Sequence, residues 1–273
     1  LSTVQQPPLD GTKVALWVYG LANVTVETLA EGLVAARQGT FTHLWLAQAI
    51  ATGDDSGMQT RHILQRYADQ LGHNGCTLAD HCVRTWFFVD DIDHQYAQRL
   101  TPDTHFIAST GIGGRTANAT ARVMMDAYAV QGLQPGQVAH LYAPDHLNRT
   151  SDYGVRFERG TTVDYADRRQ AFISGTASID NQGRVVAPGD ICLQTQRMWQ
   201  NVQALLAEAD MDFGHVAQLL VYLRDPSDYA VVSRLFARRF PATPHVILWA
   251  PVCRPGWLLE MECIAVKATD TDA

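Results

Sequence analysis

Two carboxylates stand at alternate positions in the apolar segment WLLEMECIAV, near the end of this 273-residue chain. They are Glu260 and Glu262, and residues two apart on a strand share one face. The apolar neighbours predict a core strand, where an unpaired carboxylate is costly to bury. Burial raises a carboxyl pKa from about 4.3 toward neutrality, and the protonated group can then act as a general acid. We predict this role for Glu260. Glu262 holds a water, raises the pKa of Glu260 by like charge or, as we expect, faces solvent.

Three arginines are candidates for binding a substrate carboxylate, and Arg254 is the one that we predict first for this role. They are Arg254, which follows Cys253, Arg159 in the segment FERG and Arg224 in the segment VYLRDP. A guanidinium group binds a carboxylate through two parallel hydrogen bonds. Each of the three is equally well explained as a salt bridge at an interface, and the sequence leaves both roles open.

Five smaller or aromatic residues complete the predicted site. Cys253, seven residues before Glu260, either lines the pocket or packs as a small residue in the core, and the resemblance described below favours the pocket. Gly175 and Thr176 follow the start of a hydrophobic strand. Either their backbone N–H groups bind an oxyanion, or the chain forms a tight hairpin at this point. Tyr153 and Tyr222 orient a water or a ring hydroxyl, or pack in the core.

The elements that carry these residues occur twice in the chain. Apolar spacing predicts a helix over 59–71 before the strand VRTWFFV, and a helix over 194–207 before the strand AQLLVYL. The offset is 135 residues at the helix and 134 at the strand, and the difference falls in a turn, where a length change costs little. Such self-similarity indicates an internal duplication.

The closing strands of the two copies differ in one carboxylate. When RVMMDAYAV is aligned with WLLEMECIAV from their shared Ala-Val ends, Asp126 matches Glu262 and Met124 takes the place of Glu260. We therefore predict a degenerate domain over 1–133, a linker over 134–152 and a domain with the active site over 153–273. Each is expected to be an α+β unit, a mixed sheet with helices packed on one face. The first copy has little room for a second helix between Tyr96 and Pro102.

The second half resembles a known family over about 110 residues. FISGTASIDNQGRVVAPGD, VYLRDPSDY and LLEMECIAV, in this order and spacing, are similar to the Rid (reactive intermediate deaminase, YjgF-like) superfamily. The resemblance implies a fold like that of a small chorismate mutase and a homotrimer with clefts between subunits. Members that hydrolyse imines carry an arginine where this chain has Thr243, which disfavours that activity here.

A narrower resemblance is to the chorismatases, which join a degenerate Rid-like region to a Rid-like domain and cleave pyruvate from chorismate. It rests on SGTASI, on Tyr222 with Arg224, and on Cys253-Arg254 before Leu-Leu-Glu. It implies that Glu260 is the catalytic acid and that Cys253 lies at a position that distinguishes formation of 3-hydroxybenzoate. The sequence departs from the chorismatases after SGTASI, where DNQG replaces their usual Gly-His.

These observations predict a hydrolase or lyase without cofactor or metal that acts on a small anionic enol ether and releases pyruvate. An enamine or imine hydrolase is the alternative, because both reactions begin by protonating an electron-rich carbon. A non-catalytic trimer that binds a small ligand is the third possibility.

Composition excludes several other classes of protein. The net charge of −7 and the pI near 5.7 provide no basic field for nucleic acid, which argues against the ribonuclease activity described for some Rid proteins. The sequence contains no apolar run of about 18 residues, so it predicts no membrane-spanning helix. Five scattered cysteines do not indicate a disulfide framework, so the reducing cytoplasm is expected.

Zinc binding is a minor alternative for one set of residues, His73, Cys76, His81 and Cys82. The segment GIGGRT lacks the full dinucleotide fingerprint and predicts a turn.

Overall fold

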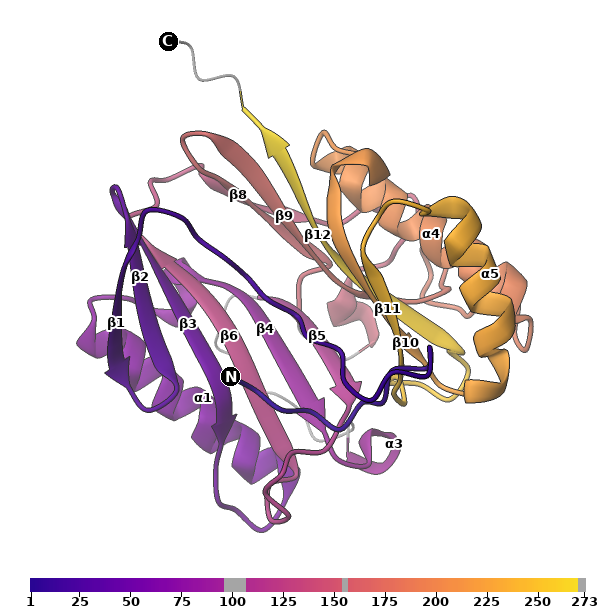
Figure 1. The fold of residues 1–273 in the computed structure, drawn as a ribbon, viewed down its shortest axis with the longest axis horizontal. Coiled ribbons are helices and arrows are strands. Elements are labelled where there is room, and N and C mark those ends of the chain that lie inside the picture. The colour runs from indigo at the N-terminus through magenta and orange to yellow at the C-terminus, as the bar shows by residue number, and fades with distance from the viewer. Residues whose placement is uncertain (96–106, 154–156, 270–273) are drawn as a thin grey trace.

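The computed structural model describes residues 1–95, 107–153 and 157–269, which contain two six-stranded mixed sheets (Figure 1). The first sheet has the order β1-β2-β3-β6-β4-β5, in which only β4 and β5 are parallel neighbours. Its strands are β1 (Thr25–Ala30), β2 (Leu33–Gln38), β3 (Phe41–Ile50), β4 (Cys82–Val89), β5 (Ala108–Gly113) and β6 (Val123–Gln131).

The second sheet repeats this order as β7-β8-β9-β12-β10-β11, again with one parallel pair, β10 and β11. Its strands are β7 (Val138–Leu141), β8 (Gly160–Asp164), β9 (Arg168–Thr176), β10 (Val216–Leu223), β11 (His245–Trp249) and β12 (Leu259–Ala268). β7 falls inside the segment that we predicted to be a linker, whereas the domain boundaries themselves stay a prediction.

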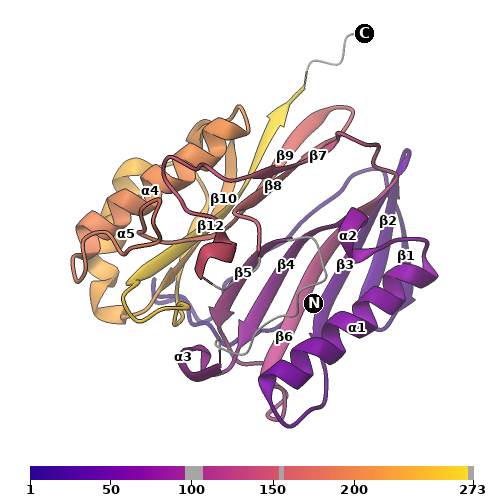
Figure 2. The same cartoon turned by 180° about the vertical axis from the view of Figure 1, so that it is seen from behind.

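Helices cover the outer face of each sheet, as Figure 2 shows from behind. α1 packs on β3 and β6 of the first sheet, and α4 packs on β9 and β12 of the second, with α5 beside it. The helices are α1 (Ser56–His73), α2 (Leu78–His81), α3 (Ile92–Gln95), α4 (Ile191–Glu208) and α5 (Tyr229–Arg239), with short 3₁₀ turns η1 (Thr150–Tyr153), η2 (Phe213–His215) and η3 (Pro226–Asp228). The predicted fold class is confirmed. None of the helices in the described residues is long and apolar enough to cross a membrane.

A buried glutamine at the same place in α1 and α4 supports the duplication. The Gln59 amide donates to the carbonyls of Gly53 and Thr120 and accepts from the backbone N–H of Arg122. Gln194 makes the same three contacts in the second unit, with Ala187, Gly256 and Leu258. Each glutamine thus ties the loop before its helix to the start of the closing strand of its own unit.

Strand register confirms the alignment of the two closing strands. Met124 of β6 pairs with Phe88 of β4, and Glu260 of β12 pairs with Tyr222 of β10, which lies 134 residues after Phe88. The replacement of Glu260 by a methionine in the first copy is therefore a difference at one structural position.

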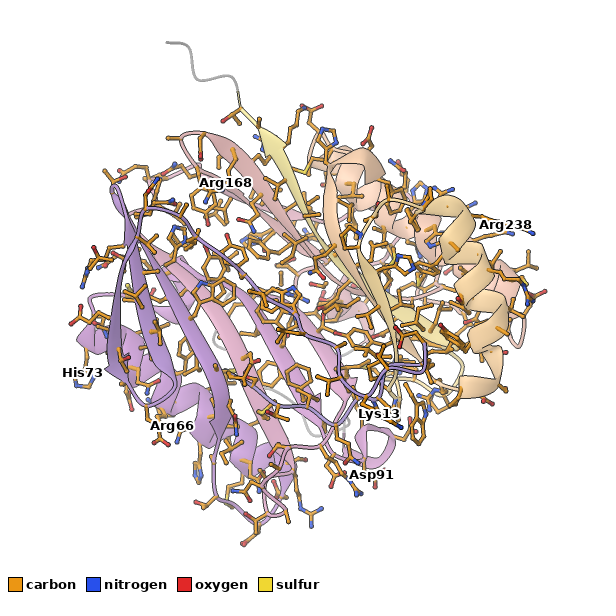
Figure 3. All side chains as sticks on the ribbon, in the orientation of Figure 1. Lys13, Arg66, His73, Asp91, Arg168 and Arg238 are labelled. Carbon is orange, nitrogen blue, oxygen red and sulfur yellow. The ribbon has the colours of Figure 1, made fainter. Side chains whose placement is uncertain are left out.

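The inner faces of the two sheets enclose a shared core. Side chains from β4, β5 and β6 pack against those of β8, β9 and β12, and they fill the space between the ribbons in Figure 3. Arg66 and His73, labelled in the same view, lie on α1 outside this space. Buried apolar area of this kind is the main stabilising contribution to folding. The predicted shortage of helix between Tyr96 and Pro102 lies outside the described residues.

The N-terminal segment spans both sheets before the first strand begins. Gln5 pairs with Arg115 after β5, and Pro8 pairs with Leu248 of β11. Further along, the ring of Trp17 lies 5.9 Å from that of Trp86 on β4. The two units are thus joined by this segment as well as by their facing cores.

Candidate active site

Glu260 lies in the middle of the second sheet on the face that meets the first. Only 3% of its surface is exposed, and none of the described residues donates a hydrogen bond to its carboxylate. Burial and the negative charge of Glu262 raise the pKa of Glu260 to about 8, against the opposing effect of the cations Arg159 and Arg224. A carboxyl group in this setting is largely protonated at neutral pH and can donate a proton.

Glu262 is buried and fully hydrogen-bonded, so the expectation that it faces solvent was wrong. Arg84 Nη2 donates to Glu262 Oε2 at 2.7 Å, and Trp86 Nε1 donates to Oε1 at 2.9 Å. The Thr110 hydroxyl makes a third contact with Oε2. All three partners come from β4 and β5 of the first unit. Glu262 is therefore buried because the first unit packs against its strand.

A β-bulge brings Gly175 against the acid. Met261 pairs with Thr176 and Cys263 pairs with Ile173, so Ser174 and Gly175 together oppose one residue of β12. A Cβ atom placed on Gly175 would lie 3.1 Å from Glu260 Oε2. The absence of a side chain at this position therefore leaves room for the carboxylate.

The Gly175 N–H and the Thr176 hydroxyl already have partners in the structure. Gly175 N donates to Thr110 Oγ1 at 2.9 Å, and Thr176 Oγ1 donates to the carbonyl oxygen of Ser174 at 2.9 Å. An oxyanion role for Gly175 thus requires a substrate oxygen to replace the Thr110 hydroxyl, and this role stays a prediction.

Arg159 is the predicted arginine that lies deepest in the protein. It is buried, and its Nη2 donates to the backbone and side-chain oxygens of Asn148 at 3.1 and 3.2 Å. It also lines a cavity of about 520 Å³ together with residues of the segment before β8, among them Arg149 and Glu158. Glu260 is not among the described residues that line this cavity. The positive charge of Arg159 nevertheless acts on Glu260 and offsets part of the rise of its pKa.

Arg224 binds a carboxylate of the protein itself. Its Nη1 and Nη2 atoms donate to the two oxygens of Asp93 on α3, at 2.9 and 3.0 Å. Its Nε donates to the carbonyl oxygen of Trp257 at 3.3 Å. This is the bidentate geometry that we predicted for a substrate, formed here as an ion pair between the two units.

Cys253 and Arg254 lie on the segment that leads from β11 to β12. The Cys253 thiol donates to the carbonyl oxygen of Gly111 on β5 at 2.9 Å, so it lies where the two units meet. Arg254 is exposed, and its guanidinium carbon lies 5.9 Å from the centre of the Trp257 ring. The structure thus places Cys253, but not Arg254, at the junction that holds Glu262.

Tyr222 is fully buried opposite Glu260 in the strand register. Burial and the neighbouring carboxylate of Glu262 raise the pKa of its phenol well above the usual value, so it remains neutral. Tyr153 ends η1, and its side chain lies outside the described part of the structure.

The sequence prediction missed the first unit's contribution of Arg84, Trp86 and Thr110 to this site. A signal was available for one of them, since Arg84 is a lone charge in the apolar strand VRTWFFV and a buried arginine needs a carboxylate partner. No equivalent signal marks Thr110, whose contact with Glu262 spans 152 residues of sequence.

The alternative zinc site is not formed in the described residues. These contain no group of three or more His, Cys, Asp and Glu side chains placed to hold a metal ion. His73 and His81 instead bond to nearby backbone, the carbonyl oxygen of Asp69 and the N–H of Thr77.

Comparisons with known proteins agree with this architecture. The family described as Endoribonuclease L-PSP matches residues 161–267. A RutC family protein of Pyrococcus abyssi is 33% identical over 98 residues, which cover 35% of this chain and 77% of that protein. The 3-aminoacrylate deaminase RutC of Acinetobacter baylyi is 26% identical over 101 residues, 34% of this chain and 76% of that protein.

The likeness to one solved structure extends over both units. A crystal structure of a chorismatase matches with a TM-score of 0.69 and 20% identity, covering 87% of this chain and 78% of that one. At this identity the likeness shows the fold, including the first unit that the family match does not reach.

Proposed function

Because the chain belongs to the Rid (reactive intermediate deaminase, YjgF-like) superfamily, we propose that it is a cofactor-free hydrolase or lyase that acts on a small anionic enol ether. One observation carries the proposal. Glu260 is a buried carboxyl group without a hydrogen-bond donor among the described residues, and its pKa is raised to about 8. It is thus suited to give up a proton at neutral pH.

The proposed reaction begins with proton transfer from Glu260 to the terminal carbon of the enol ether. The electrons of the carbon–carbon double bond form the new C–H bond, and the ether oxygen stabilises the resulting cation. Water then adds to the cationic carbon while the Glu260 carboxylate takes up the released proton. The hemiketal so formed collapses to a ketone, which is pyruvate for chorismate as substrate, and an alcohol. Glu260 ends the cycle protonated, so no cofactor is consumed.

In this proposal we assign the substrate carboxylate to Arg159 in place of Arg254, which is exposed. Arg159 is buried, and its charge acts on Glu260. Arg224 is less suited because its guanidinium group binds Asp93. In this proposal Tyr222, Cys253, Gly175 and Thr176 shape the site, and the roles of Tyr153 and Arg254 stay predictions.

Hydrolysis of an enamine or imine is the second candidate. It uses the same first step, and the relative from Acinetobacter baylyi bears the name of a 3-aminoacrylate deaminase. Hydrolysis of imines of simple amino acids is disfavoured, because this chain has Thr243 where those enzymes carry the arginine that binds the substrate carboxylate.

The two reactions release different products, which makes a direct test. Purified protein is incubated with chorismate and with freshly generated aminoacrylate, and pyruvate and ammonia are followed by coupled dehydrogenases. Pyruvate from chorismate supports the enol ether proposal. Ammonia from aminoacrylate without pyruvate from chorismate overturns it in favour of the deaminase. Release of neither product points to a trimer that binds a small ligand without turnover.

A homotrimer in the cytoplasm belongs to the same proposal. The chain mass of 30.1 kDa gives a clear measurement, since light scattering must then report three chains. A monomer mass would mean that the protein has no clefts between subunits, whereas the site between the two units of one chain would be unaffected.

A further inference from the structure

A buried polar network crosses from the first unit to the second beside Glu260. Arg84 is 1% exposed, and it donates to Glu262 Oε2 at 2.7 Å and to Ser174 Oγ at 3.1 Å. The Thr110 hydroxyl contacts Arg84 and Glu262, and it accepts from Gly175 N at 2.9 Å. Two residues of the first unit thus hold both the carboxylate next to the acid and the bulge that faces it.

These contacts reach Glu260 by two routes. Glu262 lies two residues along β12 on the same face, and its charge is one of the causes that raise the pKa of Glu260. Gly175 lies against Glu260 Oε2, with its Cβ position only 3.1 Å away and 3.0 Å from Thr110 Cγ2. A shift of Arg84 or Thr110 therefore changes both the charge and the space around the acid.

The duplicated elements carry this network in one direction only. Strand register places Gln218 of β10 where the first unit has Arg84, and Val246 of β11 where it has Thr110. The first unit in turn has Met124 where the second has Glu260. The first unit therefore carries Arg84 and Thr110 but has no acid at the position of Glu260. The second unit carries the acid but has no counterpart of Arg84 or Thr110.

We propose that Arg84 and Thr110 are positioning residues for the reaction at Glu260, through which the degenerate first unit sets the charge and the geometry of the acid. This inference rests on the proposed role of Glu260 as general acid. It assigns the first unit a part in the chemistry beyond support of the fold.

Several charged or titratable groups face Glu260 from the surrounding elements, and the proposal concerns one pair among them. They are Glu262 on β12, Tyr222 on β10, Arg224 directly after β10 and Arg159 before β8, with Arg84 on β4 bound to Glu262. Arg159, Arg224 and Tyr222 are left unchanged in the test, so that the effect of the Arg84–Glu262 pair is isolated.

The test compares Glu262→Gln, Arg84→Met and the double variant. Loss of the Glu262 charge leaves Arg84 unopposed, so the protonation midpoint of Glu260 moves down by about one pH unit or more. Loss of Arg84 leaves Glu262 unopposed, so the midpoint moves up. The double variant removes both charges and returns the midpoint to within about half a unit of wild type.

The midpoint is read from ¹³C-carboxyl spectra of glutamate-labelled protein, with Glu260→Gln to assign the signal. Opposite shifts that cancel in the double variant support the proposal. Unchanged midpoints in all three folded variants overturn it. This readout needs no substrate, so a failure of the proposed reaction is recognised separately, as absence of turnover in wild-type protein with normal titration.

Thr110→Val tests the geometric route without changing any charge. Valine has nearly the shape of threonine but lacks the hydroxyl that Gly175 and Glu262 contact. We expect kcat to fall about tenfold or more with KM nearly unchanged, and Thr110→Ser to restore most of it. Equal activity of Thr110→Val and wild type contradicts the positioning role, and the folded state of each variant is checked by near-ultraviolet circular dichroism.

Discussion

At the scale of single residues, the central feature is a glutamic acid kept neutral by its surroundings. Burial is the largest cause of its raised pKa, and the Glu262 charge adds to it. The apolar neighbours in WLLEMECIAV were sufficient to predict burial of Glu260. They were insufficient for Glu262, whose partners Arg84 and Trp86 come from 178 and 176 residues earlier in the chain.

The first prediction is a pH profile. A general acid must be protonated to act, so kcat should be constant near pH 6 to 7 and fall above pH about 8, the pKa of Glu260. Initial rates of product release across pH 6 to 9.5 measure this. A rate that rises through this range would instead indicate that the deprotonated carboxylate acts as a base.

The second prediction concerns stability. The folded-state pKa of about 8 lies above the unfolded value near 4.3, so the folded state binds more protons and loses stability as pH rises between the two. Glu260→Gln cannot ionise. Its free energy of unfolding relative to wild type should therefore grow from pH 4.5 to pH 8 by on the order of a few kcal/mol.

Urea unfolding at several pH values measures this difference. Glu31→Gln serves as the control, because Glu31 is exposed and the same chemical change there should give no such trend. A difference that stays constant with pH would mean that Glu260 ionises normally in the folded protein.

At the scale of elements, the bulge of β9 is the local irregularity that makes the site. It places two residues opposite one, and this brings Gly175 close to both Thr110 and Glu260. The glycine in FISGTASI is consistent with this close approach of backbone and side chain, which no alanine could make without displacing a neighbour.

The third prediction is that Gly175→Ala lowers both activity and stability. Its methyl group would meet Thr110 Cγ2 at 3.0 Å and Glu260 Oε2 at 3.1 Å, closer than ordinary contact. We expect a loss of about 1–3 kcal/mol in the free energy of unfolding, typical of an overpacked core. Gly20→Ala is the matched control, since nothing lies within 4 Å of the added group. Equal behaviour of the two variants would show that β9 adjusts freely.

Sequence pattern was enough for the elements with strong periodicity. The predicted helices over 59–71 and 194–207 correspond to α1 and α4, and VRTWFFV and AQLLVYL to β4 and β10. β5, β7 and β11 were missed because they are short edge strands of six, four and five residues. Runs of this length do not show a period that distinguishes them from loops. The turn predicted for GIGGRT was wrong in its first half, since residues 111–113 belong to β5.

At the scale of the whole molecule, two ion pairs among the described residues join the units in different environments. Arg84–Glu262 is buried, with side-chain exposures of 2% and 4%, whereas Arg224–Asp93 has 19% and 35%. Breaking a buried pair leaves one charge without a partner in a medium of low dielectric constant, and an exposed pair is largely screened by water.

The fourth prediction follows from this contrast. Arg84→Met should lower the free energy of unfolding by about 3–5 kcal/mol, and Asp93→Asn by about 1 kcal/mol or less. Denaturant unfolding of both variants measures the difference. Similar losses in the two variants would indicate that the buried network contributes no more to the junction than the partly exposed pair.

The duplication was recognisable from the sequence, but the shared site was not. Matching helices and strands identify two related units, and the substitution of Met124 for Glu260 shows which unit carries the acid. Contacts between units follow from how the two sheets face each other, which no pattern within either unit encodes. Arg84 and Thr110 therefore became visible as parts of the site only in three dimensions.

The most direct test of the central claim is pyruvate release from chorismate at pH 7 by Glu260→Gln, compared with Glu31→Gln. The amide keeps the shape of the side chain but cannot donate a proton to carbon in the same way, so we predict a loss of at least about 100-fold in kcat for Glu260→Gln and none for Glu31→Gln. Equal pyruvate release by the two variants would contradict the assignment of Glu260 as the general acid.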